Sequence, residues 1–99
     1  MADLYETLAA PARRAILDAL HERDGQTLFE LCVRLSTHYD LALTRQAVSQ
    51  HLNMLEAAGL LTTRREGRYK YHSLDTTPLH AIVERWLTPR KPRPQEGET

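Results

Sequence analysis

Residues 44–60 carry the side chains best suited to recognising another molecule. A mostly apolar set recurs there at helical spacing and predicts one buried stripe: Ala47, Val48, His51, Leu52, Leu55 and Ala58. Largely off this stripe lie hydrogen-bonding side chains, uncharged except for one arginine: Arg45, Gln46, Ser49, Gln50 and Asn53. A solvated helix is usually decorated with Glu and Lys instead. Such a polar face suits the donors and acceptors on base-pair edges in the major groove of DNA.

A basic hairpin is predicted directly after this helix. Two short β-prone runs, residues 60–65 and 68–74, are separated by Glu66 and Gly67, and a two-residue spacer with Gly indicates a tight turn. Basic and tyrosine side chains surround the tip: Arg64, Arg65, Arg68, Tyr69, Lys70 and Tyr71. Helix, short connection and basic hairpin is the order of a winged helix-turn-helix. We therefore expect an α+β fold, mostly α, with about five helices and one hairpin wing.

The charge of the chain is balanced overall but unevenly distributed. Thirteen Lys and Arg residues match thirteen Asp and Glu residues. Residues 1–43 carry four Arg and seven acidic residues (net −3), and residues 44–73 carry five basic and two acidic residues (net +3). In residues 74–99 four basic residues cancel four acidic ones. A local basic stripe, rather than the total charge, is the electrostatic footprint of a surface that binds phosphates.

Length and composition favour one small domain. We expect this domain over residues 1–88 and a disordered tail over residues 89–99, because the last segment is polar and rich in proline. A chain of 99 residues buries only about 60–65% of its unfolded surface, so pairing with a second chain would add stability. Neither a membrane-spanning run nor an apolar signal core is visible, and we expect the protein in the cytoplasm.

Capping signals predict three helices in the N-terminal part of the chain. Asp3 with Glu6, and Thr27 with Glu30, have the spacing of capping boxes at the starts of the first and third helices. Pro11 fits the first turn of the second helix, where its missing N–H costs nothing.

A strongly apolar last helix is expected after the hairpin, with Thr77 as its N-cap and Pro78 at its first position. Three helices and a hairpin already fill the core, so the spare apolar surface indicates a partner chain. Together with the first helix it would form a homodimer interface of Leu4, Tyr5, Leu8, Ile82, Val83, Trp86 and Leu87.

The ordered set of these segments closely resembles the ArsR-type winged-helix repressors. The resemblance covers roughly residues 4–87. It rests on Ala12-Arg13-Arg14-Ala15-Ile16-Leu17, Phe29-Glu30-Leu31-Cys32, Ala47-Val48-Ser49-Gln50-His51-Leu52, Leu55-Glu56-Ala57-Ala58-Gly59-Leu60, and Arg65-Glu66-Gly67-Arg68 with Tyr71. It implies a sequence-specific transcriptional regulator. Repression, by blocking the access of polymerase, is the expected sign of regulation.

The resemblance also implies how DNA would be bound. The helix from Thr44 would enter a major groove and the wing would reach the flanking backbone or minor groove. The expected contacts are Thr44, Arg45, Gln46, Ser49, Gln50, His51, Arg64, Arg65, Arg68, Tyr69 and Lys70. A solvated face and a plain charged hairpin are the alternatives, and for His51 the alternative is packing on the helix. Arg13 and Arg14 are expected in surface or intersubunit ion pairs. A twofold dimer implies a near-palindromic double-stranded operator.

One segment departs from the family pattern. Most relatives have a tight turn before the recognition helix, whereas residues 36–43 form a connection several residues longer. Either the third helix continues for another turn or the loop bulges, and a longer connection could tilt the recognition helix.

Metal sensing, the best-known activity of the family, lacks most of its ligands in this chain. Thiolate-type sensors carry Cys-Val-Cys in the third helix, where this chain reads Cys32-Val33-Arg34 and so has one thiolate beside a cation. We expect Cys32 to be a small buried residue. Only Asp75, His80 and Glu84 resemble the family's second site, on the last helix. We therefore expect no metal site and no cofactor.

Catalysis finds little support either, because the sequence has no Gly-rich phosphate loop and no nucleophile with a base at recognisable spacing. We expect a protein that is not an enzyme. Two rival functions stay open. A metal- or redox-responsive sensor of the same fold should be released from DNA by zinc, arsenite or peroxide. A winged helix used only for protein binding would bind no duplex DNA.

Overall fold

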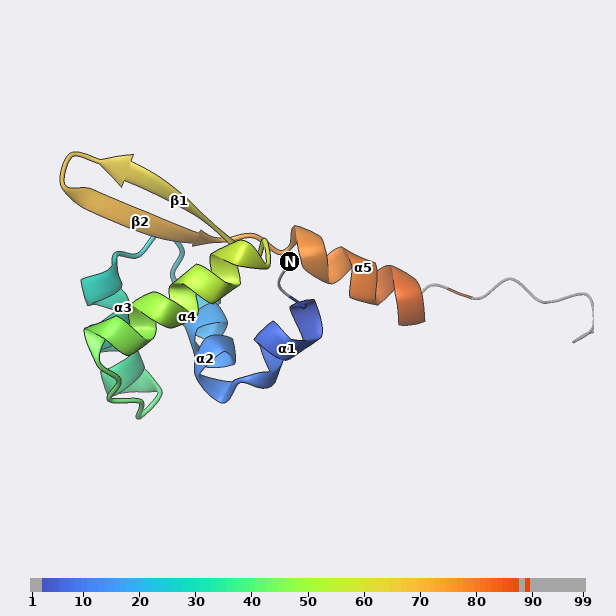
Figure 1. Cartoon of the computed structure of the whole chain (residues 1–99), viewed down its shortest axis with the longest axis horizontal. Helices are drawn as coiled ribbons and strands as arrows, with labels where there is room; N and C mark the ends of the chain where they lie inside the picture. The colour runs from blue at the N-terminus through green and yellow to red at the C-terminus, as the bar shows by residue number, and fades with distance from the viewer. Residues whose placement is uncertain (1–2, 88, 90–99) are drawn as a thin grey trace, which may run out of the picture.

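The computed structural model describes residues 3–87 and residue 89. Over this range the chain forms helices α1 (Leu4–Ala9), α2 (Pro11–Glu22), α3 (Leu28–His38) and α4 (Arg45–Ala57), strands β1 (Leu61–Glu66) and β2 (Tyr69–Leu74), and helix α5 (Thr77–Trp86). Figure 1 shows α1–α4 gathered beneath the hairpin, with α5 projecting away from them. The expected winged helix-turn-helix fold is confirmed. The predicted tail, residues 89–99, lies outside the described residues except for Pro89.

The core fills the space between α2, α3, α4 and the base of the hairpin. Its buried members are Ala15, Ile16, Ala19, Leu20, Leu31, Leu35, Val48, Leu52, Leu55, Leu60 and Leu61. The stripe predicted for α4 is confirmed at Val48, Leu52 and Leu55, whereas Ala47 and His51 are half-buried. Truncating one such core leucine to alanine typically costs about 2–5 kcal/mol. The apolar face of α4 therefore fixes the direction of its polar face.

The helix starts follow the capping signals in part. The Thr27–Glu30 capping box is formed: the Thr27 N–H donates to Glu30 Oε1 at 2.9 Å, and the Glu30 N–H donates to Thr27 Oγ1 at 3.2 Å. At α1 the expected box with Glu6 does not form, although Asp3 still caps the helix. Asp3 Oδ1 accepts from the Tyr5 N–H at 2.9 Å, and Glu6 makes no return bond to the cap.

The long connection before α4 begins as an extension of α3. The helix continues to His38, and the chain then turns at Asp40, whose φ is +53°. The Leu41 N–H donates back to the Leu35 carbonyl at 2.9 Å, and Leu41 and Leu43 pack against the core. The first of the two alternatives for residues 36–43 is thus the one the structure adopts. By packing against the core, Leu41 and Leu43 hold the start of α4 in place.

The end of α4 leads directly into the hairpin through Gly59. Its φ is +78°, and the Leu60 N–H donates to the Leu55 carbonyl at 2.9 Å, which is the bond of a Schellman motif. A Cβ at Gly59 would lie 3.3 Å from Pro78 Cγ. Only a residue that tolerates the left-handed conformation and this close approach allows the wing to follow α4 without a longer loop.

The start of α5 corrects the sequence prediction by one residue. Thr76, not Thr77, is the N-cap, and Pro78 lies at the second helical position rather than the first. The cause is Asp75, whose Oδ1 accepts from the Thr77 N–H at 2.9 Å and turns the chain early. Hydrogen bonding from the Thr77 side chain, and secondarily from its N–H, lowers the pKa of the Asp75 carboxyl. No residue of α5 is fully buried in the single chain.

Candidate nucleic-acid interface

The polar face of α4 is open to solvent. Thr44 caps the helix by accepting the Ala47 N–H on Oγ1 at 3.0 Å. The side chains of Arg45, Gln46, Gln50 and Asn53 are exposed, and Ser49 is half-buried. None of these five side chains forms a hydrogen bond or ion pair with another residue in the part of the chain that the structure describes. Their donors and acceptors are therefore available to a ligand along one side of the helix.

The hairpin turn differs by one residue from the prediction. Glu66 belongs to β1 and pairs with Tyr69, so the turn residues are Gly67 and Arg68 rather than Glu66 and Gly67. Gly67 has a φ of +59°, and a glycine with positive φ at the first of two turn positions matches a type II′ turn. The positive φ at Gly67 places the turn there, and Arg68 becomes part of the tip.

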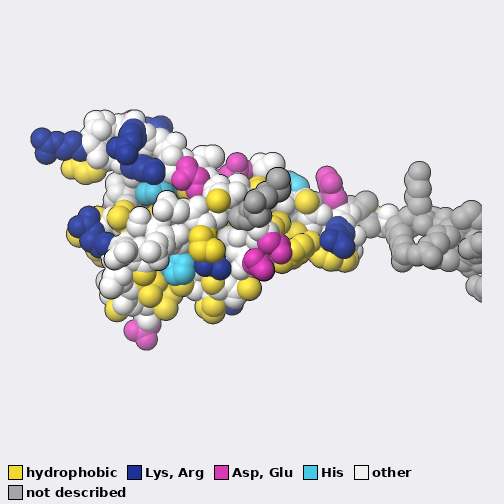
Figure 2. Space-filling view, in the orientation of Figure 1, with side chains coloured by type: hydrophobic (Ala, Val, Ile, Leu, Met, Phe, Trp, Pro, Cys, Tyr) yellow, Lys and Arg dark blue, Asp and Glu magenta, His cyan; other side chains and the backbone are white. Residues whose placement is uncertain are grey.

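Basic side chains gather over this hairpin (Figure 2). Arg64 forms an exposed ion pair with Glu66 at 2.6 Å, and its guanidinium lies 5.2 Å from the ring centroid of Tyr71. Such an exposed pair contributes at most about 1 kcal/mol. Arg65 stands directly opposite Lys70 across the two strands. Like charges in that position destabilise a hairpin, so their presence favours a role in binding an anionic partner.

Two buried polar residues fasten the wing to the helices. The backbones of Gln26 and His72 exchange hydrogen bonds at 3.0 and 2.8 Å, and His72 Nδ1 lies 2.9 Å from the Gln26 carbonyl oxygen. The Gln26 Nε2 donates to the Ala19 and Arg23 carbonyls at 3.0 and 2.6 Å. The sequence prediction missed both residues. The link spans 46 positions and leaves no local pattern to find.

Arg13 joins α1 and α4 through α2. Its Nε donates to the Thr7 carbonyl at 2.8 Å and its Nη2 to the Glu6 carbonyl at 3.2 Å. Its Nη1 lies 3.3 Å from Met54 Sδ and 3.4 Å from His51 Nδ1. Within the described chain its guanidinium thus meets carbonyls and not the expected carboxylate. The nearby Arg14 behaves alike, because it donates to a backbone carbonyl of α1.

His51 faces this arginine from the half-buried side of α4. Two effects lower the pKa of the His51 imidazole. The larger is burial, and the smaller is the positive charge of Arg13. The ring therefore lies between the core and the polar face, next to residues expected to contact DNA. Unlike the side chains of Arg45, Gln46, Ser49 and Gln50, it has a partner among the described residues.

The candidate metal ligands do not form a metal-binding group among the described residues. Among the described residues, no three His, Cys, Asp or Glu side chains are grouped closely enough to hold a metal ion. Cys32 is half-buried on α3, and burial raises the pKa of its thiol despite the charge of Arg45. Arg34 forms an ion pair with Glu22 at 3.4 Å. His80 and Glu84 are both exposed on α5.

The residues expected at a dimer interface lie on α1 and α5, which meet at Tyr5 and Trp86. Tyr5 and Trp86 pack edge to face, with ring centroids 6.0 Å apart and planes at 65°. Leu4 and Leu8 pack against the core from α1. On α5, Val83, Trp86 and Leu87 are 46%, 59% and 75% exposed, which is high for large apolar side chains in one patch.

No helix in the described residues is long and apolar enough to cross a membrane. The geometry instead defines a winged helix-turn-helix, with an open polar helix face beside a basic wing.

Comparison with known proteins agrees with this class. Residues 8–64 match a family model described as a helix-turn-helix domain. The chain is 44% identical over 84 residues to an uncharacterized HTH-type transcriptional regulator, YuzN, of Bacillus subtilis (strain 168), covering 85% of this chain and 91% of that protein. It is 32% identical over 87 residues to the transcriptional repressor SdpR of the same organism, covering 88% of each.

A solved structure of a possible transcriptional regulator for arsenical resistance superimposes with a TM-score of 0.71 at 32% identity, covering 90% of this chain and 88% of that one. The chain belongs to the ArsR-type winged helix-turn-helix transcriptional regulators. This is a family of DNA-binding regulators and not of enzymes.

Proposed function

We propose that the protein is a homodimeric, sequence-specific repressor that binds a near-palindromic DNA operator and carries no metal-sensing site. The observation that carries the proposal is the polar face of α4. Its amide and guanidinium groups are exposed, and the half-buried Ser49 hydroxyl is likewise unengaged within the described chain. Beside it lies a wing whose Arg65, Arg68 and Lys70 make no ion pair within the described chain. The amides of Gln46 and Gln50 suit adenine edges, and Arg45 suits a guanine edge, in a major groove.

The wing would supply affinity rather than sequence preference. Lysine and arginine side chains that neutralise phosphates release counterions, so binding through them weakens as salt increases. Arg65, Arg68 and Lys70, with Tyr69 and Arg64 beside them, would lie against the backbone or minor groove next to the site read by α4. The Gln26–His72 link would hold the wing at a fixed distance from that helix.

Dimerisation would proceed through α1 and α5. Trp86 and Leu87 leave most of their apolar surface exposed in the single chain, and a twofold partner would cover it. Two copies of α4 would then face successive major grooves about one helical turn apart, which gives the operator its near-twofold symmetry. Repression would follow from the occupied promoter being closed to polymerase. The similarity to the repressor SdpR supports this sign of regulation, and the proposed site of action is cytoplasmic DNA.

Metal-independent control is part of the proposal. Arg34 occupies the position of the second thiolate in the metal-sensing pattern, and it is held by Glu22. Cys32 alone supplies one soft ligand where such a site needs two or three. The purified chain is expected to be metal-free, and its DNA affinity should not respond to zinc, cadmium or arsenite. Stoichiometric metal, with operator affinity falling tenfold and recovering with chelator, would favour the sensor function instead.

Selection of bound sequences from random duplex DNA, at about 0.15 M salt, tests the proposal. The expected result is an enriched motif with near-twofold symmetry, bound by two chains per duplex. Binding without enrichment would contradict sequence-specific regulation. Absence of any duplex binding would favour the protein-binding alternative.

A further inference from the structure

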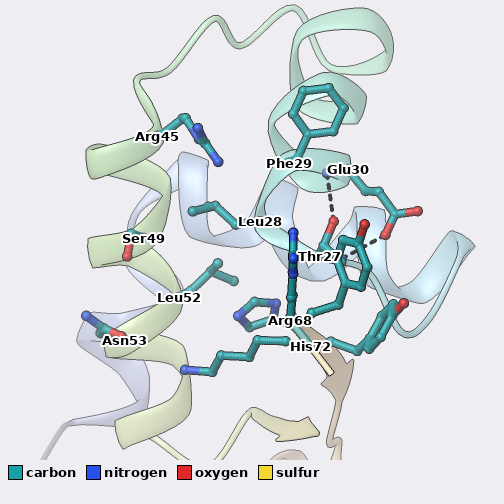
Figure 3. Close-up of a pocket in the computed structure, with 13 residues that line it drawn as sticks. Thr27, Leu28, Phe29, Glu30, Arg45, Ser49, Leu52, Asn53, Arg68 and His72 are labelled. Atoms are coloured by element: carbon teal, nitrogen blue, oxygen red, sulfur yellow. Dashed lines mark hydrogen bonds between the residues drawn. The ribbon is translucent and has the colours of Figure 1, made fainter. Parts of the chain in front are cut away.

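A cavity of about 650 Å³ lies between α4, the hairpin and the first turn of α3 (Figure 3). We infer that this cavity binds a small organic anion, an aromatic ring that bears a carboxylate, and that the bound anion displaces operator DNA. The second half of this inference rests on the proposed function. The first half, binding in the cavity, stands on the geometry alone.

The charges around the cavity favour an anion. Arg45 of α4 and Arg68 and Lys70 of the hairpin line it, and none of them forms an ion pair or hydrogen bond with another described residue. Figure 3 shows Arg45 extending from α4 and Arg68 from the hairpin. The one carboxylate in the lining, Glu30, folds back onto the Thr27 N–H at 2.9 Å. That hydrogen bond is the main cause of the lowered pKa of Glu30, so the site carries three cations against one anion.

The imidazole of His72 adds a hydrogen-bond acceptor to the lining of the cavity. His72 lines the cavity and is 5% exposed. Its Nδ1 lies 2.9 Å from the Gln26 carbonyl oxygen, which only accepts, so Nδ1 carries the hydrogen. Nε2 then has no partner in the described residues, yet it is not sealed away from solvent. With the hydrogen on Nδ1, Nε2 can only accept, so the cations of the lining, and not His72, would bind the carboxylate.

The first turn of α3 points to the same chemistry. The capping box uses the N–H groups of Thr27 and Glu30, whereas those of Leu28 and Phe29 are the orphan donors of the helix start. Such donors, at the positive end of the helix dipole, bind carboxylates and phosphates. Together with the cationic groups of Arg45, Arg68 and Lys70, they form a set of donors for one anionic head group.

The rest of the lining is apolar and distinguishes an organic anion from a simple one. Leu28 and Leu52 contribute aliphatic surface, and the rings of Phe29, Tyr69 and Tyr71 contribute aromatic surface. Phe29 is 64% exposed, so its ring is accessible to a ligand in the cavity. A volume of about 650 Å³ lies within the usual range for sites of small organic ligands. A flat ring with one carboxylate fits both parts of this lining.

Occupation of the cavity would oppose DNA binding directly. Arg45, Ser49, Arg68 and Lys70 belong both to the lining and to the proposed DNA-contacting surface. A bound carboxylate would neutralise cations that otherwise meet phosphates, and its ring would fill the space between the recognition helix and the wing. Ligand and operator therefore compete, which makes the ligand an inducer of the proposed repressor.

Titration of the full chain without DNA tests the site. We would use 2-naphthoate as the probe, with neutral 2-naphthamide and inorganic phosphate as comparators, and follow binding by calorimetry. The expected result is one naphthoate per chain, with the amide and phosphate bound at least tenfold more weakly. Absence of saturable naphthoate binding would overturn the inference, and so would phosphate binding as tightly as naphthoate.

Matched variants locate the site. Arg68→Gln should weaken naphthoate at least fivefold, whereas Arg65→Gln, on the same hairpin but outside the lining, should change it less than twofold. Phe29→Ala should also weaken it at least fivefold, whereas Val33→Ala, exposed one turn further along α3, should not. All four side chains are exposed, so the fold should survive each change. Equal naphthoate affinity in all four variants would place the ligand elsewhere and overturn the inference.

The link to DNA is measured separately. Saturating naphthoate should weaken the binding of a selected operator at least tenfold, and Phe29→Ala, which lies outside the proposed DNA contacts, should remove most of this effect. Operator binding that is unchanged by naphthoate would contradict the inducer role. If no duplex is bound at all, the proposed function fails, and the naphthoate titration still decides whether the cavity is a ligand site.

Discussion

His51 Nδ1 lies 3.4 Å from Nη1 of Arg13, so the recognition helix is joined to α2 by two side chains that can both carry positive charge. Because a guanidinium only donates, the imidazole must accept at Nδ1 and be free of a proton there. The same arginine donates to the carbonyls of Glu6 and Thr7 in α1. Protonation of His51 would therefore strain the contact that positions three helices.

The first prediction is a loss of stability at mildly acidic pH. The unfolded chain protonates His51 near its ordinary pKa of about 6.5, whereas burial and Arg13 lower the pKa in the folded chain. The contribution of the neutral ring is thus fully present above about pH 6.5, and it is lost as pH falls toward the folded-state pKa. Urea denaturation between about pH 5 and pH 8 should show a steeper decline for the wild type than for His51→Gln. Parallel stability curves for the two proteins would show that the environment of His51 in the folded chain does not lower its pKa.

Recognition of the operator sequence should depend on the two glutamines of α4. Gln46→Ala and Gln50→Ala should each reduce the affinity for a selected operator by about 1–3 kcal/mol, because each removes an amide that can pair with a base through two hydrogen bonds. Affinity for a scrambled duplex, measured by fluorescence anisotropy, should change little and serves as the control. An equal loss on both duplexes would mean that these residues read no sequence.

The wing arginines should control the salt dependence of binding. Arg65→Ala and Arg68→Ala should weaken binding to every duplex, and the slope of log K against log salt should shrink by about one for each phosphate that is no longer neutralised. Arg23→Ala, an exposed arginine on the α2–α3 turn, is the matched control and should leave the slope unchanged. A slope unaltered in both wing variants would place the wing away from the DNA.

Assembly should depend on Trp86. Its ring packs against Tyr5 and is 59% exposed in the single chain, so a partner chain would bury it. Trp86→Ala should weaken the dimer by about 2 kcal/mol or more, as for other buried aromatic anchors. Tyr69→Ala removes an aromatic side chain of similar exposure from the wing and should leave the dimer intact. Sedimentation of the wild type as a monomer at micromolar concentration would contradict this account of α5.

The stability of the junction between the recognition helix and the wing should depend on glycine at position 59. Gly59→Ala must adopt a φ near +78° and place a Cβ 3.3 Å from Pro78 Cγ, so the free energy of unfolding should fall by about 1–2 kcal/mol. Asparagine tolerates the left-handed conformation better, and Gly59→Asn should lose less. Chemical denaturation of the three proteins gives the comparison, and an Ala variant as stable as the wild type would refute the argument.

Local patterns in the sequence were sufficient for the elements and for most of the candidate surface. The stripe of Val48, Leu52 and Leu55 fixed which face of α4 is buried, and the Thr27–Glu30 spacing fixed the start of α3. Both signals act within one or two helical turns. The exposed polar face of α4 and the basic hairpin follow from them, since a buried stripe determines what lies opposite.

Other features depended on contacts that no local pattern reports. The turn at Gly67–Arg68 and the earlier cap at Thr76 each differ by one residue from prediction, because a positive φ at Gly67 and the Asp75 carboxylate decide the positions. The Gln26–His72 link and the reach of Arg13 to His51 join residues 46 and 38 positions apart. Burial and pairing over such distances arise only from the packed chain.

The central claim, that α4 reads a specific DNA sequence while the wing holds the duplex, is tested most directly by the ratio of two affinities. The wild-type chain is titrated at about 0.15 M salt into a selected operator and into a scrambled duplex of the same length and composition. We predict an affinity for the operator at least about 10³-fold higher, in the range usual for specific regulators. Equal affinity for the two duplexes would contradict the claim.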